Sequence, residues 1–124
     1  MEAEALNIPA VIAGAVAAFI FGWIIYHPKV LGKTWAEGSG VDLGGSPPAM
    51  AFVAQILGLI SLAIVVGVTA TVSFLGTALL AILACAMFVV SGGAFLKKST
   101  GALVTDGVYV IGAGALMIVA QGLL

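Results

Sequence analysis

Apolar residues dominate four long stretches within residues 1–124, which we expect to form one domain: residues 8–26, 49–71, 75–96 and 103–124. Each stretch is long enough for a membrane span, because about twenty residues at about 1.5 Å per residue cross the hydrocarbon core of a bilayer. The stretches lack the alternation of apolar and polar residues that is typical of membrane-spanning strands. The pattern therefore predicts an all-α protein, a bundle of four transmembrane helices with up-down topology.

The composition indicates the environment of the protein and excludes several classes of function. Hydrophobic residues make up 63% of the chain and charged residues 7%, whereas a soluble domain carries about 25% charged residues. This excludes a water-soluble fold and predicts contact with a lipid bilayer. The net charge of −1, without a basic run, argues against nucleic-acid binding. Cys85 is the only cysteine, which excludes an intrachain disulfide, and we expect no metal and no cofactor.

The lysines predict how the bundle is oriented. Lys29 and Lys33 follow the first span, and Lys97 and Lys98 follow the third. In an up-down bundle these two segments share one side, and the positive-inside rule places that side in the cytoplasm. We therefore expect a multi-pass protein of the inner (plasma) membrane, with both termini outside and a larger cytoplasmic loop over residues 27–48.

The first span carries small residues at every fourth position: Ala10, Gly14, Ala18 and Gly22. These positions lie on one face of a helix, where a neighbouring backbone can approach closely. We prefer the interpretation that Gly14, Ala18 and Gly22 pack against another helix inside the bundle. The alternative is that they form the seam of a homo-oligomer. Shorter pairs, such as Ala54 and Gly58, recur in the other spans, so we expect self-association of the protein.

Aromatic and basic residues gather around the expected cytoplasmic end of the first span. Trp23, Tyr26 and Trp35 suit the headgroup layer of a membrane, and Lys33 suits anionic headgroups. Anchoring at the interface explains these residues without a ligand, and we prefer it to a binding site. His27 has no second histidine or cysteine near it, so an interfacial histidine is preferred to a metal ligand.

Five residues in this region share a distinctive spacing: Tyr26, Pro28, Gly32, Lys33 and Trp35. With Gly22 in the span before them, this spacing resembles the hallmark of domain of unknown function 1761, a family of small bacterial integral membrane proteins. The resemblance covers the whole chain and implies four spans, with a polar patch at the start of the last span where Asp106 and Tyr109 fall. This chain has Ile25 and Leu31 where members often have Trp and Phe. The resemblance implies no biochemical activity.

Asp106 is the acid with an apolar stretch on both sides. A carboxylate at membrane depth is costly and is by default a functional candidate. We prefer a second interpretation, in which the fourth helix begins near Thr105 and Asp106 caps free N–H groups in its first turn. Within the spans, Gln55 and Gln121 can form hydrogen bonds across helices.

These observations lead to three functional hypotheses. The first is a non-enzymatic membrane protein that self-associates or serves as an accessory subunit of a larger membrane complex. The second is an oligomeric transporter or channel for a small solute or proton, with Asp106 and Gln55 as pathway groups. The third is a lipid-headgroup binder or an enzyme at the cytoplasmic mouth, where an enzyme would be built from Asp106, Tyr109, His27, Tyr26 and Lys33. We prefer the first, because the spans contain no nucleophile–base pair and no pair of carboxylates.

Overall fold

The computed structural model of the protein describes residues 6–42 and 47–124. Within these ranges the elements follow in this order: α2 (Ile8–Ile25), η1 (Pro28–Gly32), α3 (Lys33–Ser39), α4 (Ala49–Thr71), α5 (Leu75–Phe95) and α6 (Thr100–Leu123). Of these, α2, α4, α5 and α6 are long and apolar enough to cross a membrane. The predicted all-α fold with four such helices is confirmed. Residues 1–5 and residues 43–46 of the predicted loop 27–48 lie outside the described ranges.

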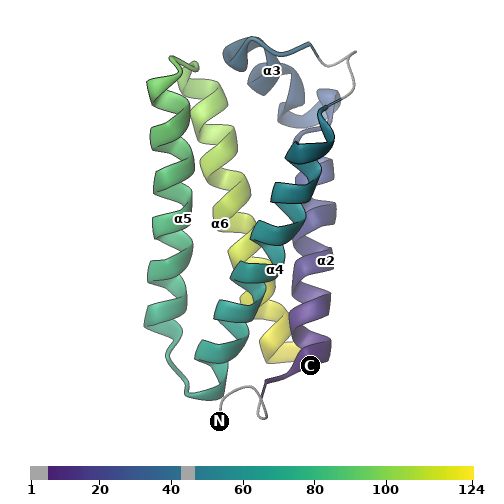
Figure 1. The fold of residues 1–124 in the computed structure, drawn as a ribbon, viewed down its shortest axis with the longest axis vertical. Helices are drawn as coiled ribbons and strands as arrows, with labels where there is room; N and C mark the ends of the chain where they lie inside the picture. The colour runs from purple at the N-terminus through teal and green to yellow at the C-terminus, as the bar shows by residue number, and fades with distance from the viewer. Residues whose placement is uncertain (1–5, 43–46) are drawn as a thin grey trace.

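The four long helices run side by side in alternating directions, and α3 lies across one end of them (Figure 1). The turn between α5 and α6 lies at the same end, so all four lysines gather there, and we call it the lysine-bearing end. The turn between α4 and α5 lies at the opposite end. Because α6 packs against α2, α3, α4 and α5, it is the central helix of the bundle.

The start of α6 differs from the predicted one. The helix begins at Thr100, and the Ser99 side chain caps it by accepting a hydrogen bond of 3.1 Å from the Ala102 N–H. Lys97 has a positive φ of 60° in the turn just before. At about 3.6 residues per turn, Asp106 lies in the second turn of the helix. The prediction that Asp106 caps the fourth helix is wrong, because Ser99 supplies the capping oxygen at an earlier position.

The stripe of small residues on α2 is buried: Ala10, Gly14, Ala18 and Gly22. A Cβ atom added to Gly14 would lie 3.0 Å from the Met117 Cα, and one added to Gly22 would lie 2.6 Å from the Tyr109 ring. Both neighbours belong to α6, so the missing side chains let α2 and α6 approach closely. The stripe therefore packs inside the bundle and is not free to form the seam of a homo-oligomer.

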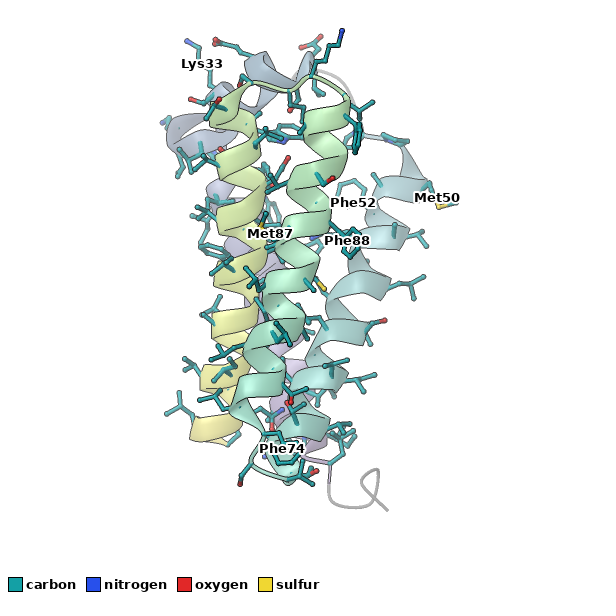
Figure 2. All side chains as sticks on the ribbon, turned by 90° about the vertical axis from the view of Figure 1, so that its left-hand side faces the viewer. Lys33, Met50, Phe52, Phe74, Met87 and Phe88 are labelled. Carbon is teal, nitrogen blue, oxygen red and sulfur yellow. The ribbon has the colours of Figure 1, made fainter. Side chains whose placement is uncertain are left out.

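The interior and the outer surface of the bundle are both apolar over most of their length. Leu62, Ile82 and Met117 are buried in the core. Large apolar side chains also point outward, among them Met50 at 71% and Phe88 at 80% exposure (Figure 2). An outer surface of this kind is stable against lipid, where apolar side chains carry no cost of exposure.

Candidate functional site

A group of polar and aromatic side chains fills the interior at the lysine-bearing end. We call it the polar cluster, and its members are Tyr26, Trp35, Gln55, Lys98, Asp106 and Tyr109. They come from the end of α2, from α3, α4 and α6, and from the turn before α6. Asp106 and Tyr109 are three residues apart on α6, so they share one face of the central helix.

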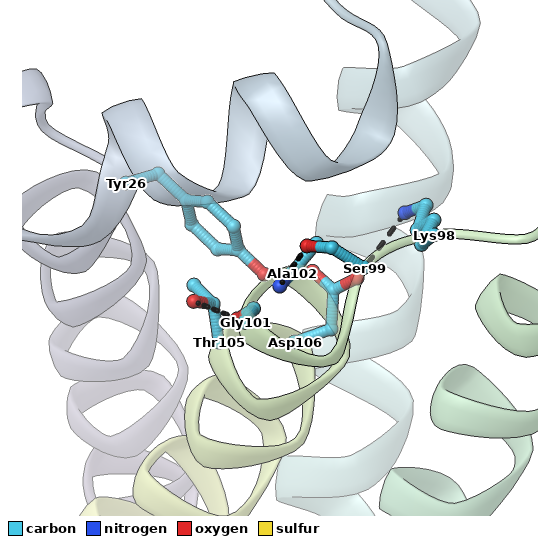
Figure 3. Close-up of polar contacts among 7 residues, drawn as sticks. All are labelled: Tyr26, Lys98, Ser99, Gly101, Ala102, Thr105 and Asp106. Carbon is cyan, nitrogen blue, oxygen red and sulfur yellow. Dashed lines mark hydrogen bonds and ion pairs between the residues drawn. The ribbon is translucent and has the colours of Figure 1, made fainter.

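Asp106 lies at the centre of the polar cluster and is only 6% exposed. The Tyr26 hydroxyl donates to its Oδ1 at 2.5 Å, and the Lys98 ammonium donates to its Oδ2 at 3.2 Å (Figure 3). A buried carboxylate is costly unless it is paired and hydrogen-bonded, and here each oxygen has its own donor. The ordinary pKa of tyrosine, about 10, keeps a phenol protonated at neutral pH. Asp106 therefore joins the end of α2 to the turn between α5 and α6.

Tyr109 connects the polar cluster to α4 and to the apolar core. Its hydroxyl accepts a hydrogen bond from the Gln55 Nε2. Its ring meets the Tyr26 ring edge-on with 5.5 Å between centroids, and it stacks on Phe21 at 6.3 Å. Gly22 leaves room for this ring, because any side chain there would collide with it. The hydrogen bond from Gln55 thus attaches α4 to α6, and the hydrogen bond between Tyr26 and Asp106 attaches the end of α2 to the same helix.

Trp35 places α3 over the end of α6. Its ring meets the Tyr26 ring edge-on at 5.1 Å, and the Lys98 ammonium lies 5.5 Å from the Trp35 ring centroid. An ammonium over an aromatic face is attracted by the ring quadrupole. Lys98 therefore contacts both Trp35 and Asp106, and one lysine links α3 to the central helix.

Glycines let the segment after α2 fold back onto the bundle. A Cβ atom on Gly32 would collide with the backbone carbonyl of Tyr26, and one on Gly38 would collide with Ser99. The Ser99 N–H donates to the Gly38 carbonyl at 3.0 Å, which ties the end of α3 to the start of α6. The segment from Tyr26 to Trp35 is therefore folded back against the bundle. Glycine is needed at Gly32 because the backbone of this segment contacts itself closely there.

The predicted site residues fall into two groups. Gln55, Asp106 and Tyr109 meet in the polar cluster. His27 and Lys33 are exposed and lie outside it. The His27 Nδ1 accepts a hydrogen bond of 3.1 Å from the backbone N–H two residues later, so the imidazole caps a local turn. The roles predicted for these five residues as ligand or pathway groups stay predictions.

The three predicted interface anchors differ in their surroundings. Trp23 is 72% exposed on the outside of α2, where it can meet lipid. Tyr26 and Trp35 are half-buried and contact each other in the polar cluster. Anchoring at the interface stays a prediction for all three, and the structure gives Tyr26 and Trp35 contacts inside the protein as well.

Sequence reasoning missed Lys98 as the partner of Asp106. The signal that could have revealed it is Ser99, a preferred N-cap residue that precedes an apolar run. With the helix start placed there, Asp106 moves from the first turn into the second. Lys98 then lies just outside the helix, where its long side chain can fold back along α6 to the carboxylate.

The chemistry of the polar cluster suits cohesion between helices. Both carboxylate oxygens of Asp106 are engaged by donors from other parts of the chain. Among residues 6–42 and 47–124, no group of three or more His, Cys, Asp or Glu side chains is placed to hold a metal ion. The cluster therefore joins α2, α3, α4 and α6 through one carboxylate, two phenols, an amide, an ammonium and an indole.

The fold and the polar cluster define a class of protein: a small bundle of four membrane-spanning-type helices, closed at one end by a short helix over a buried carboxylate. The chain belongs to the family described as Protein of unknown function (DUF1761), whose model matches residues 9–122. This confirms the resemblance found from the spacing of Tyr26 to Trp35, and the match includes the whole polar cluster. No match was found among curated proteins or among solved structures.

Proposed function

We propose that the protein acts through assembly in a membrane, either with copies of itself or as an accessory subunit of a larger membrane complex. The observation that carries this proposal is a set of glycines on the outside of α4 and α5. A side chain at Gly58, Gly76 or Gly92 would meet nothing within 4 Å. Helices in lipid associate by close packing at small residues, so these positions offer a neighbouring helix the close approach that α6 already makes to α2.

On α4 the open position is part of a pair. Ala54 and Gly58 are four residues apart, so they share one face of the helix, and both are exposed. The pair has the small-xxx-small spacing that the buried stripe on α2 uses against α6. The face of α4 that carries Ala54 and Gly58 is therefore the surface through which we expect a partner helix to pack.

The lysines support an orientation for this assembly. All four lie at the lysine-bearing end, and the positive-inside rule favours that end on the cytoplasmic side. We accordingly propose the plasma membrane as the location, with α3 on the cytoplasmic side. A protease or labelling reagent outside intact cells would then leave the turn at Lys97 and Lys98 untouched.

The test of assembly compares two substitutions on α4. Gly58→Leu fills the open position, whereas Val53→Leu changes an exposed residue, 50% exposed, away from the Ala54 and Gly58 face. In lipid bilayers, single-molecule photobleaching is expected to show oligomers for wild type and Val53→Leu, and about tenfold weaker association for Gly58→Leu. If wild type is monomeric, mild co-purification with and without Gly58→Leu tests the accessory role. A monomer that brings no partner would contradict the proposal.

Transport receives less support from the geometry. Asp106 and Gln55 lie in the polar cluster, but the buried residues next in the direction of the opposite end are apolar, among them Leu62, Ile82 and Met117. A path for water or protons needs polar groups or room for water along its length. We therefore rank assembly above transport.

A further inference from the structure

An apolar groove lies on the outside of the bundle between α5 and α6, and we call it the α5–α6 groove. Its volume is about 380 Å³, within the range of about 300–1,000 Å³ that is usual for small-molecule sites. Phe21 of α2, Met87 and Val90 of α5, and Val108 and Ile111 of α6 are among its lining residues, all of which are apolar. The groove therefore suits a hydrocarbon chain and offers nothing to a polar solute.

The start of α3 lies over the face of α6 that lines this groove. Gly101 precedes Val108 by seven residues, about two helical turns, so both lie on one face of α6. A Cβ atom on Gly101 would lie 2.8 Å from the Thr34 Cγ2, which shows that α3 packs on this face. Lys33 is next to Thr34 and is exposed. Figure 2 shows Lys33 at the lysine-bearing end, beyond α6, with Met87 between α5 and α6 further down.

The charge at this end complements an anion. The lysine-bearing end holds four lysines, of which Lys98 pairs with Asp106. Lys29 and Lys33 are both exposed and four residues apart. The acids described at the same end outside the cluster, Glu37 and Asp42, leave a positive balance. Anionic headgroups are attracted to lysines that lie at the edge of a membrane span.

We propose that the α5–α6 groove and Lys33 together bind one anionic phospholipid. The phosphate lies against Lys33, and one acyl chain lies in the groove along Met87 and Val108. Each half of the site alone is common, but a cation about two helical turns beyond an apolar groove has the order of charge and hydrocarbon found in a phospholipid. This site does not depend on the proposed assembly, because its lining includes none of the open glycines Gly58, Gly76 and Gly92.

The test measures which lipids stay bound to the purified protein. The protein is reconstituted with equal amounts of phosphatidylglycerol and phosphatidylcholine that have the same acyl chains, and native mass spectrometry counts the lipids retained. Wild type is expected to retain one phosphatidylglycerol in preference to phosphatidylcholine by about fivefold. Lys33→Gln is expected to remove this preference. Lys97→Gln, a matched exposed lysine at the same end, is expected to keep it.

The groove is tested at two adjacent exposed residues of α5. Figure 2 shows Met87 on the α6 side of α5 and Phe88 on the other side. Met87→Trp fills the groove and is expected to lower retention of both lipids, whereas Phe88→Trp is expected to leave retention unchanged. Circular dichroism and gel filtration check that the variants are folded, and Val108→Phe replaces Met87→Trp if that variant fails to fold.

The outcomes distinguish a specific phospholipid-binding site from non-specific attraction of anionic lipid to the protein surface. Equal retention of the two lipids by wild type would overturn the proposal. So would equal losses in Lys33→Gln and Lys97→Gln, or in Met87→Trp and Phe88→Trp, because both results describe lipid held by the surface as a whole.

Discussion

The helices α2 and α5 show two uses of glycine in the same bundle. On α2, Gly14 and Gly22 are buried against α6, and any side chain there would meet Met117 or Tyr109. On α5, Gly76 and Gly92 face open space. The spacing of small residues therefore indicates where a backbone can approach, but the position of the neighbouring helix decides whether the approach is made within one chain. Four pairs of substitutions test this difference and the contacts that accompany it.

The largest effect is expected from Gly22→Leu. The added side chain enters the space of the Tyr109 ring and forces α2 away from α6, which is expected to lower the free energy of unfolding by about 3 kcal/mol. Gly92→Leu on α5 is the matched control and is expected to change it by less than about 0.5 kcal/mol. Unfolding in mixed detergent micelles, followed by tryptophan fluorescence, measures both. Equal losses would mean that the two glycines are not used differently.

Asp106→Leu comes next, with an expected loss of about 2 kcal/mol in the free energy of unfolding. The substitution leaves the Tyr26 hydroxyl without an acceptor and Lys98 without its carboxylate. The loss stays below that of a fully buried ion pair, because the Lys98 side chain is 21% exposed and can reach water. Asp106→Asn keeps an acceptor for Tyr26 and is expected to lose about half as much. A larger loss for Asn than for Leu would contradict this account.

Tyr26→Phe is expected to cost about 1.5 kcal/mol, since a hydrogen bond to a charged group is lost while the ring remains. Tyr109→Phe loses only the bond from the neutral Gln55 amide and is expected to cost about 0.6 kcal/mol. The difference compares the attachment of α2 to α6 with that of α4 to α6. The same micelle unfolding assay measures both variants. A larger loss in the free energy of unfolding for Tyr109→Phe than for Tyr26→Phe would mean that Tyr109 forms the stronger hydrogen bond.

The smallest effect is expected from Trp35→Phe. The smaller ring keeps the edge contact with Tyr26 and the position under Lys98, and it removes an indole N–H that is buried without a hydrogen-bond partner. Gain and loss nearly offset, so we expect a change within about 0.5 kcal/mol. Trp35→Ala removes both ring contacts and is expected to cost about 2 kcal/mol. A similar cost for the two variants would show that the indole N–H matters more than the ring.

The fold could be predicted from the sequence because each long helix is determined by the residues of one continuous apolar stretch. Long apolar stretches locate the four long helices, and Asn7 and Pro9 mark the start of the first as an N-cap and a first-turn proline would. The start of α6 was misplaced because Thr100 and Gly101 interrupt the apolar run. The capping serine before them is the better guide, since a cap bond fixes a helix end more directly than hydropathy does.

Only half of the residues in the polar cluster could be identified as site residues from the sequence. Asp106 and Gln55 stood out because polar groups are rare within the spans, and Tyr109 was indicated by the resemblance to the family. Their partners did not, because Tyr26 and Asp106 are 80 residues apart and periodicity shows which face of a helix is special without showing which helix it meets. Trp35 was assigned to the lipid interface from its position near the end of the first span, beside lysines, whereas the fold-back at Gly32 brings it onto Tyr26.

The central position of α6 has a consequence for how the protein is made. The ribosome releases α2, α4 and α5 into the membrane before the helix that all of them contact. Until α6 inserts, the glycine stripe of α2 has only lipid to face, and Tyr26 lacks its carboxylate. Truncation of the nascent chain before Thr100 should therefore leave inserted helices that a quality-control protease can still tell apart from the finished protein.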